Sequence, residues 1–177
     1  MKIKIAWMGK TKEPAIQSLT DEYLKRISRY APVEGLALRD EAALLQMCGR
    51  APLAMAKTSK MMTSKTTTSR TTTSRTTTSK TTNAGKSTLA LVDPRGKQFS
   101  SEEFARFLGD YQDRNPLPLV FAVGPADGFS DAARGAAQHT NSLGPMTLPH
   151  ELARVVLLEQ VYRAFTILKG HPYHSGH

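Results

Sequence analysis

An uninterrupted apolar run at residues 117–123 constrains the fold of this chain more than any other feature. A strand without polar alternation is typical of a parallel sheet that is covered on both faces. Strand patterns and helix patterns alternate along the rest of the chain. The strand patterns lie at residues 2–8, 33–38 and 89–92, and the helix patterns at residues 14–30, 100–111, 130–138 and 149–168. This alternation predicts an α/β fold with a mainly parallel sheet.

Three connections between these elements carry further predictions. Residues 93–96, Asp-Pro-Arg-Gly, have the composition of a turn, so we expect the strand at 89–92 to end there. Residues 143–148 are compatible with a short strand or an extended loop. Residues 124–128 begin and end with glycine directly after the apolar strand, where open α/β sheets bind their ligands. An ordinary turn from strand to helix explains this glycine loop equally well.

The final helix pattern is apolar on two sides. Leu158, Val161 and Phe165 form one stripe, and Leu152 and Val156 lie on another side. One stripe can cover the sheet of its own chain, and the other is suited to a second copy. We therefore expect a homodimer, with a central helix of a monomer as the alternative.

The positive charge is concentrated in a low-complexity segment. The chain has 177 residues and a net charge of +9, and residues 42–92 contain eight Lys and Arg side chains but no acidic one. Residues 58–82 are five Thr/Ser-rich pentads, and we interpret residues 57–88 as a basic loop inserted into, or replacing part of, one domain that spans residues 1–177. The loop is either native, adding phosphate contacts, or the product of a tandem repeat or frameshift in the gene.

The numbers and positions of cysteine and histidine limit the expected cellular location and the kinds of site that the chain can form. A single cysteine and the lack of a signal peptide or an apolar span predict a cytoplasmic protein with no membrane association. Four of the five histidines lie in the last 28 residues. Because no cysteine or carboxylate stands at metal-ligand spacing beside them, we expect no metal site and favour a proton-transfer or RNA-contacting cluster.

Taken together, several segments resemble a known family. The segment from Leu148-Pro149-His150 through residues 154–165, closing with His171-Pro172-Tyr173-His174, is similar to the C-terminal half of the bacterial ribosomal RNA large subunit methyltransferase H family. The N-terminal Lys-Ile-Lys-Ile strand and the segment at residues 96–105 also resemble that family. The resemblance covers roughly residues 1–45 and 89–174.

The resemblance implies a small SPOUT-class enzyme: an α/β-knot fold with a C-terminal trefoil knot, a homodimer, and S-adenosylmethionine (SAM) held in the knot. The implied reaction is methylation of N3 of a pseudouridine in 23S rRNA within the ribosome. Carried over by position, the cofactor contacts are Val92, Gly124, Leu143, Gly144, Pro145, Met146, Thr147 and Leu148.

For catalysis, we expect His171, Tyr173 or His174 near the target base and Arg154 stabilising negative charge or holding phosphate. The sequence does not single out which residue removes the N3 proton.

Two departures from the family pattern leave an alternative open. Pro125 stands where the family usually has a second glycine, which removes a backbone donor, and residues 57–88 do not resemble the helix expected there. The alternative is an RNA- or ribosome-binding protein on the same scaffold with impaired catalysis.

Overall fold

The computed structural model describes residues 1–50 and 86–174. Residues 57–85 of the predicted basic loop (57–88) therefore lie outside the described residues. Its last residue, Thr88, is not part of a loop, because it begins a buried strand.

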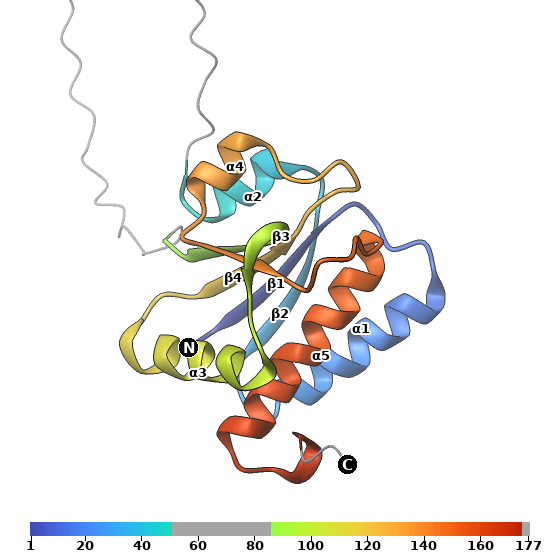
Figure 1. Ribbon diagram of the computed structural model, residues 1–177. Helices are drawn as coiled ribbons and strands as arrows, with labels where there is room; N and C mark the ends of the chain where they lie inside the picture. The colour runs from blue at the N-terminus through green and yellow to red at the C-terminus, as the bar shows by residue number, and fades with distance from the viewer. Residues whose placement is uncertain (51–85, 175–177) are drawn as a thin grey trace, which may run out of the picture.

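A five-stranded parallel sheet forms the centre of the fold (Figure 1). The strands are β1 (Ile3–Met8), β2 (Val33–Leu38), β3 (Thr88–Gln98), β4 (Leu119–Val123) and β5 (His139–Ser142). Their order is β2-β1-β4-β3-β5, and every neighbouring pair is parallel. The predicted α/β class and mainly parallel sheet are confirmed.

Helices cover both faces of the sheet (Figure 1). The helices are α1 (Pro14–Ile27), α2 (Glu41–Met47), α3 (Ser101–Arg114), α4 (Asp131–Ala136) and α5 (His150–Leu168), followed by the 3-10 turn η1 (Pro172–His174). One core lies between the sheet and α1, α3 and α5, and a smaller core lies under α2 and α4. Within residues 1–50 and 86–174, no helix is long and apolar enough to cross a bilayer.

Strand β4 shows why the apolar run was informative. Leu119, Phe121 and Val123 pack into the larger core, and Val120 and Ala122 into the smaller one. All five side chains are buried because both faces of the central strand are covered. The absence of polar alternation thus reflects two cores that share one strand.

The predicted end of β3 is wrong. The strand continues to Gln98 instead of stopping before a turn at Asp93. Its pairing with β5 is interrupted, since Val92 and Lys97 both lie opposite Asn141. Gly96 lies so close to β5 that a Cβ there would be 2.6 Å from the Asn141 backbone nitrogen. Proline and glycine therefore mark a bulge within the strand, not a chain reversal.

Strand β5 was not predicted. Its sequence, His-Thr-Asn-Ser, has no apolar alternation, and it forms a short strand at the edge of the sheet. Residues 143–148 form the loop that follows it, so the loop alternative for this segment is correct.

Candidate functional site

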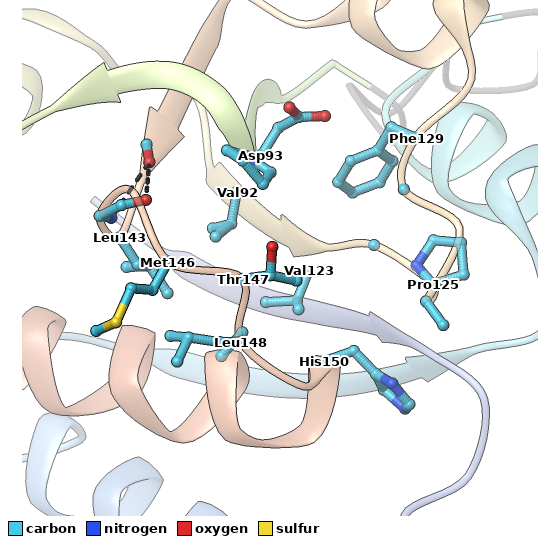
Figure 2. Close-up of a pocket in the computed structure, with 17 residues that line it drawn as sticks. Val92, Asp93, Val123, Pro125, Phe129, Leu143, Met146, Thr147, Leu148 and His150 are labelled. Atoms are coloured by element: carbon cyan, nitrogen blue, oxygen red, sulfur yellow. Dashed lines mark hydrogen bonds between the residues drawn. The ribbon is translucent and has the colours of Figure 1, made fainter.

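A cavity opens beside the bulge of β3 and at the carboxyl ends of β4 and β5 (Figure 2). Its volume is about 130 Å³. Sites for drug-sized ligands are usually at least about 300 Å³, so such a ligand would fill the cavity and extend through its mouth. The lining comes from the bulge of β3, the end of β4 and its following loop, the end of β5 and its following loop, and the first turn of α5: Val92, Asp93, Pro94, Val123, Gly124, Pro125, Ala126, Gly128, Phe129, Ser142, Leu143, Gly144, Met146, Thr147, Leu148, His150 and Ala153.

The positions expected to contact a cofactor gather at this cavity. Val92, Gly124, Leu143, Gly144, Met146, Thr147 and Leu148 line it, whereas Pro145 lies in the same loop but is not among the lining residues. Figure 2 shows Val92 and the loop from Leu143 to Leu148 on facing sides of the cavity. The structure thus brings together residues from three separate segments, and their contact with a cofactor stays a prediction.

Gly124 is required by the packing of its own loop. A Cβ at this position would lie 2.9 Å from Cε2 of Phe129, closer than side-chain carbons normally approach. Phe129 is itself buried and lines the cavity. A larger residue at position 124 would displace the Phe129 ring and change the cavity wall.

The loop after β5 is held by a local hydrogen-bond pair. The Ser142 hydroxyl accepts from the Gly144 N–H at 3.2 Å and donates to the Gly144 carbonyl at 3.0 Å. Gly144 has φ of 140°, a conformation that favours glycine. These bonds, drawn as dashed lines in Figure 2, fix the start of the loop that lines the cavity.

Asp93 is a charged wall residue that the sequence analysis missed, because it assigned the residue to a turn. The carboxylate is buried, accepts from the Arg95 N–H at 2.9 Å and pairs with Nε of Arg134 at 3.0 Å. Burial raises the pKa of Asp93, but the Arg95 amide and the Arg134 guanidinium outweigh it, so the pKa lies below its ordinary value. This ion pair connects the bulge of β3 to α4.

Arg154 lies inside the fold, one turn after the start of α5. Its side chain is 1% exposed and its guanidinium carbon is 4.3 Å from the centre of the Trp7 ring. Nε and Nη2 of Arg154, and Nε1 of Trp7, are buried and have no hydrogen-bond partner within the part of the chain that the structure describes. Burial lowers the pKa of Arg154, and Glu151 and Asp21 act in the opposite direction.

The C-terminal tail folds back along the second half of α5. The His171 N–H donates to the Thr166 carbonyl at 2.8 Å, and the Tyr173 hydroxyl donates to Oε1 of Glu159 at 3.3 Å. The Tyr173 ring packs edge-on against Tyr162 at 4.8 Å between centroids. Burial, together with Tyr23 and Glu159, raises the pKa of Tyr173 to about 12. The side chain of His174 lies outside the described residues.

Within one chain, the structure does not bring the four predicted catalytic residues together. Arg154 is buried on Trp7 near the start of α5. The helix ends at Leu168, roughly 21 Å farther along its axis at about 1.5 Å per residue, and Tyr173 then folds back onto Glu159 and Tyr162. His150, by contrast, lines the cavity although the sequence analysis placed it only in a histidine cluster. Its position directly after the predicted cofactor loop was the available signal.

No group of three or more His, Cys, Asp or Glu side chains within residues 1–50 and 86–174 is arranged to hold a metal ion.

Comparison with known proteins decides the family. Residues 1–174 match the family model described as predicted SPOUT methyltransferase. This chain belongs to the SPOUT methyltransferase family. It is 47% identical over 177 residues to the ribosomal RNA large subunit methyltransferase H of Koribacter versatilis, covering 100% of both chains. It is 38% identical over 174 residues to the protein of the same name from Geobacter sp. strain M21, covering 98% of this chain and 99% of that one.

These full-length relatives confirm the resemblance to the ribosomal RNA large subunit methyltransferase H family. A solved structure from Legionella pneumophila, described as a candidate methyltransferase with the cofactor SAM bound, covers 93% of this chain and 66% of its own. At 14% identity and a TM-score of 0.43, the similarity is too low to support a conclusion about this SPOUT family member.

Proposed function

We propose that this chain transfers a methyl group from SAM to N3 of a pseudouridine in the 23S rRNA of the bacterial large ribosomal subunit. Membership of the SPOUT class and rRNA as the substrate rest on the family match and the full-length relatives. The cavity supports the use of SAM, because residues carried over from the family as cofactor contacts line it from three segments. The choice of N3 of a pseudouridine rests on the resemblance to the family.

The residues of the cavity fit SAM chemically. Val92, Leu143 and Leu148 supply apolar side chains for an adenine ring. SAM supplies a methyl group that is already electrophilic. The protein must therefore mainly bind and orient both reactants, and manage the proton on N3.

We assign Arg154 to stabilising the negative charge that develops on the target base. The two unpartnered N–H groups of a buried guanidinium support this assignment, since a desolvated cation acts more strongly on nearby charge than an exposed one. We assign His171, Tyr173 and His174 to contacts with the target base or its phosphate. The tail lies far from the cavity of its own chain, so this role requires the cavity of a second copy.

We propose a homodimer that buries the outer side of α1 and α5. Leu19, Leu152 and Val156 are 44%, 46% and 37% exposed there, which supports an apolar interface.

The proposal further includes the C-terminal trefoil knot, a single domain over residues 1–177, a cytoplasmic location, no metal and no membrane partner, and 23S rRNA within the ribosome as the substrate.

A second candidate is a ribosome-binding protein on the same scaffold with impaired catalysis. Pro125 favours it, because this residue lines the cavity and has no N–H to offer a ligand. Retained RNA binding without methyl transfer would distinguish this candidate from the enzyme.

Mass spectrometry of rRNA nucleosides, from cells with and without the gene, tests the proposed function. We expect N3-methylpseudouridine to disappear with the gene and to return when purified protein and SAM are added to the undermethylated ribosomes. Calorimetry with SAM is the companion measurement. Heat of binding with no methylated product, or no heat at all, would favour the impaired scaffold.

A further inference from the structure

Two titratable side chains line the cavity, Asp93 and His150. The two oxygens of Asp93 are engaged, one by the Arg95 N–H and the other by Arg134. The imidazole of His150 has no hydrogen bond or ion pair with any residue that the structure describes. It is half-buried at the first position of α5, where Figure 2 shows it at the edge of the cavity. Among the described residues that line the cavity, His150 therefore presents a ring whose nitrogens are not engaged by another described residue.

The proposed reaction needs such a group. N3 of a uracil-type base carries a proton, and its lone pair becomes fully nucleophilic only when that proton leaves. A general base must lie within hydrogen-bond reach of the proton it removes. The loop from Leu143 to Leu148 leads directly into Pro149 and His150, so the cofactor wall and this imidazole are neighbours in the chain and in the cavity.

We propose that His150 is the catalytic base that accepts the N3 proton of the target pseudouridine. This role rests on the proposed function. A neutral ring nitrogen of His150 takes the proton while the N3 lone pair forms a bond to the methyl carbon. The bond from that carbon to sulfur breaks and leaves its electron pair on sulfur, giving S-adenosylhomocysteine. The imidazolium then returns its proton to water.

Arg154 supports this step from the following turn of the same helix. Residues four apart lie on one face of a helix, so Arg154 follows His150 on the same face of α5. Its guanidinium packs on Trp7 and does not line the cavity, so its charge acts on the cavity through the wall. Negative charge on the pyrimidine carbonyls grows as the proton leaves, and a nearby cation stabilises it. His150 thus accepts the proton, and the charge of Arg154 stabilises the anion that remains.

The tail is less suited to this role. Tyr173 bonds to Glu159, packs on Tyr162 and has a pKa of about 12, so it holds its proton at neutral pH. His171 begins the tail beyond the opposite end of α5. These residues remain suited to contacting RNA, while the base lies in the same chain as the cavity.

The test compares His150→Ala and His150→Gln with His139→Ala. His139 is the matched control, since its half-buried ring packs on Phe107 at 5.0 Å and does not line this cavity. Single-turnover methylation of undermethylated ribosomes is measured at saturating SAM, and the SAM Kd is measured separately by calorimetry. We expect both His150 variants to lose about 10²- to 10⁴-fold in rate, with the SAM Kd within about threefold of wild type. His139→Ala should react like wild type.

Added imidazole separates a lost base from a structural defect. It should restore part of the rate to His150→Ala, because it can enter the space left by the side chain. A His150 variant within about threefold of the wild-type rate, a loss explained by weaker SAM binding, or a loss that imidazole does not restore would overturn the assignment. If His150→Ala does not fold, the more conservative His150→Gln decides. A wild-type protein that makes no N3-methylpseudouridine would instead overturn the proposed function.

Discussion

The first turns of α5 and its second half differ in how their polar groups are satisfied. In the second half, which begins at Glu159 in the middle of the helix, Glu159 accepts from both Arg163 and Tyr173, and the rings of Tyr162 and Tyr173 pack together. In the first turns, Arg154 is buried with two nitrogens that have no hydrogen-bond partner among the described residues, and His150 lines the cavity. One helix thus carries a self-contained polar cluster in its second half and unused hydrogen-bonding capacity in its first turns.

This difference separates structural roles from functional ones. Buried polar groups in proteins are nearly always hydrogen-bonded, because leaving one unsatisfied costs about 1–3 kcal/mol. Nε and Nη2 of Arg154 have no such bond to the described residues and so keep hydrogen-bonding capacity. In the cluster of Glu159, Arg163 and Tyr173, the side chains bond to one another and stabilise the fold.

Replacing Arg154 gives the largest expected effect. We expect Arg154→Met to lower the methylation rate at least about 100-fold, in the range seen when a charge-stabilising donor is removed. The free energy of unfolding should stay the same or rise by about 1–4 kcal/mol, because an apolar side chain replaces an unpaired buried cation. Rates on ribosomes and urea unfolding check both expectations. A large loss of stability would show that the contact with Trp7, or a hydrogen-bond partner, holds Arg154 in the fold, and would weaken the contrast between the first turns of α5 and its second half.

The next prediction concerns the wall of the cavity. Gly124→Val should weaken SAM binding about tenfold or more, or roughly 1.4 kcal/mol, because the new side chain pushes on the Phe129 ring. Gly135→Ala is a matched control, since a Cβ at this helical position meets no atom within 4 Å. The control should bind SAM normally and be slightly more stable. Calorimetry measures both, and equal affinities would mean that the wall adapts.

Substitution in the tail cluster of Glu159, Arg163 and Tyr173 should change the stability of the fold and leave SAM binding unchanged. Glu159→Gln removes the charge that holds Arg163 and weakens the bond to Tyr173, so we expect the free energy of unfolding to fall by about 1 kcal/mol. The SAM Kd should not change, because Glu159 does not line the cavity. A change in SAM affinity without a change in stability would show that Glu159 serves ligand binding and does not stabilise the fold.

The smallest expected effect is the titration of Tyr173. Its pKa in the folded state is about 12, above the ordinary value of 10, so folding favours the neutral phenol. The stability that this contributes is fully present below about pH 10 and is lost as the pH rises through about 12. Absorbance of tyrosinate between pH 9 and 13 should show a late step that Tyr173→Phe removes. A normal titration would mean that the tail is not packed as described.

Individual residues explain how much of the fold could be predicted from the sequence. The run at residues 117–123 predicted β4 and the covered parallel sheet, because burial on both faces excludes polar side chains. His139–Ser142 could not be recognised as β5, since an edge strand stabilised by backbone pairing needs no apolar pattern. Asp93-Pro94-Arg95-Gly96 has the same composition whether it reverses the chain or bulges from a strand, and only its contact with Asn141 decides.

The candidate site was predictable to a similar degree. The family resemblance singled out seven of the seventeen residues that line the cavity, because Gly124 and residues 143–148 are recognised directly in the sequence. Burial of Arg154 on Trp7, and the packing of Tyr173 on its own helix, depend on contacts between distant segments. The sequence around Arg154 and Tyr173 is equally compatible with an exposed helix face, so it does not predict either contact.

The place of β4 in the sheet has a consequence for the order of folding. It is the fourth strand in the chain but lies between β1 and β3, pairing Ile3 with Leu119. A nascent chain that ends before Leu119 can form the local β1–β2 pair, but β1 and β3 have no shared neighbour to join them. Pairing between such distant residues is slow. The cavity walls therefore assemble only after most of the chain has been synthesised, and substitutions in β4 should delay the appearance of ligand binding during refolding.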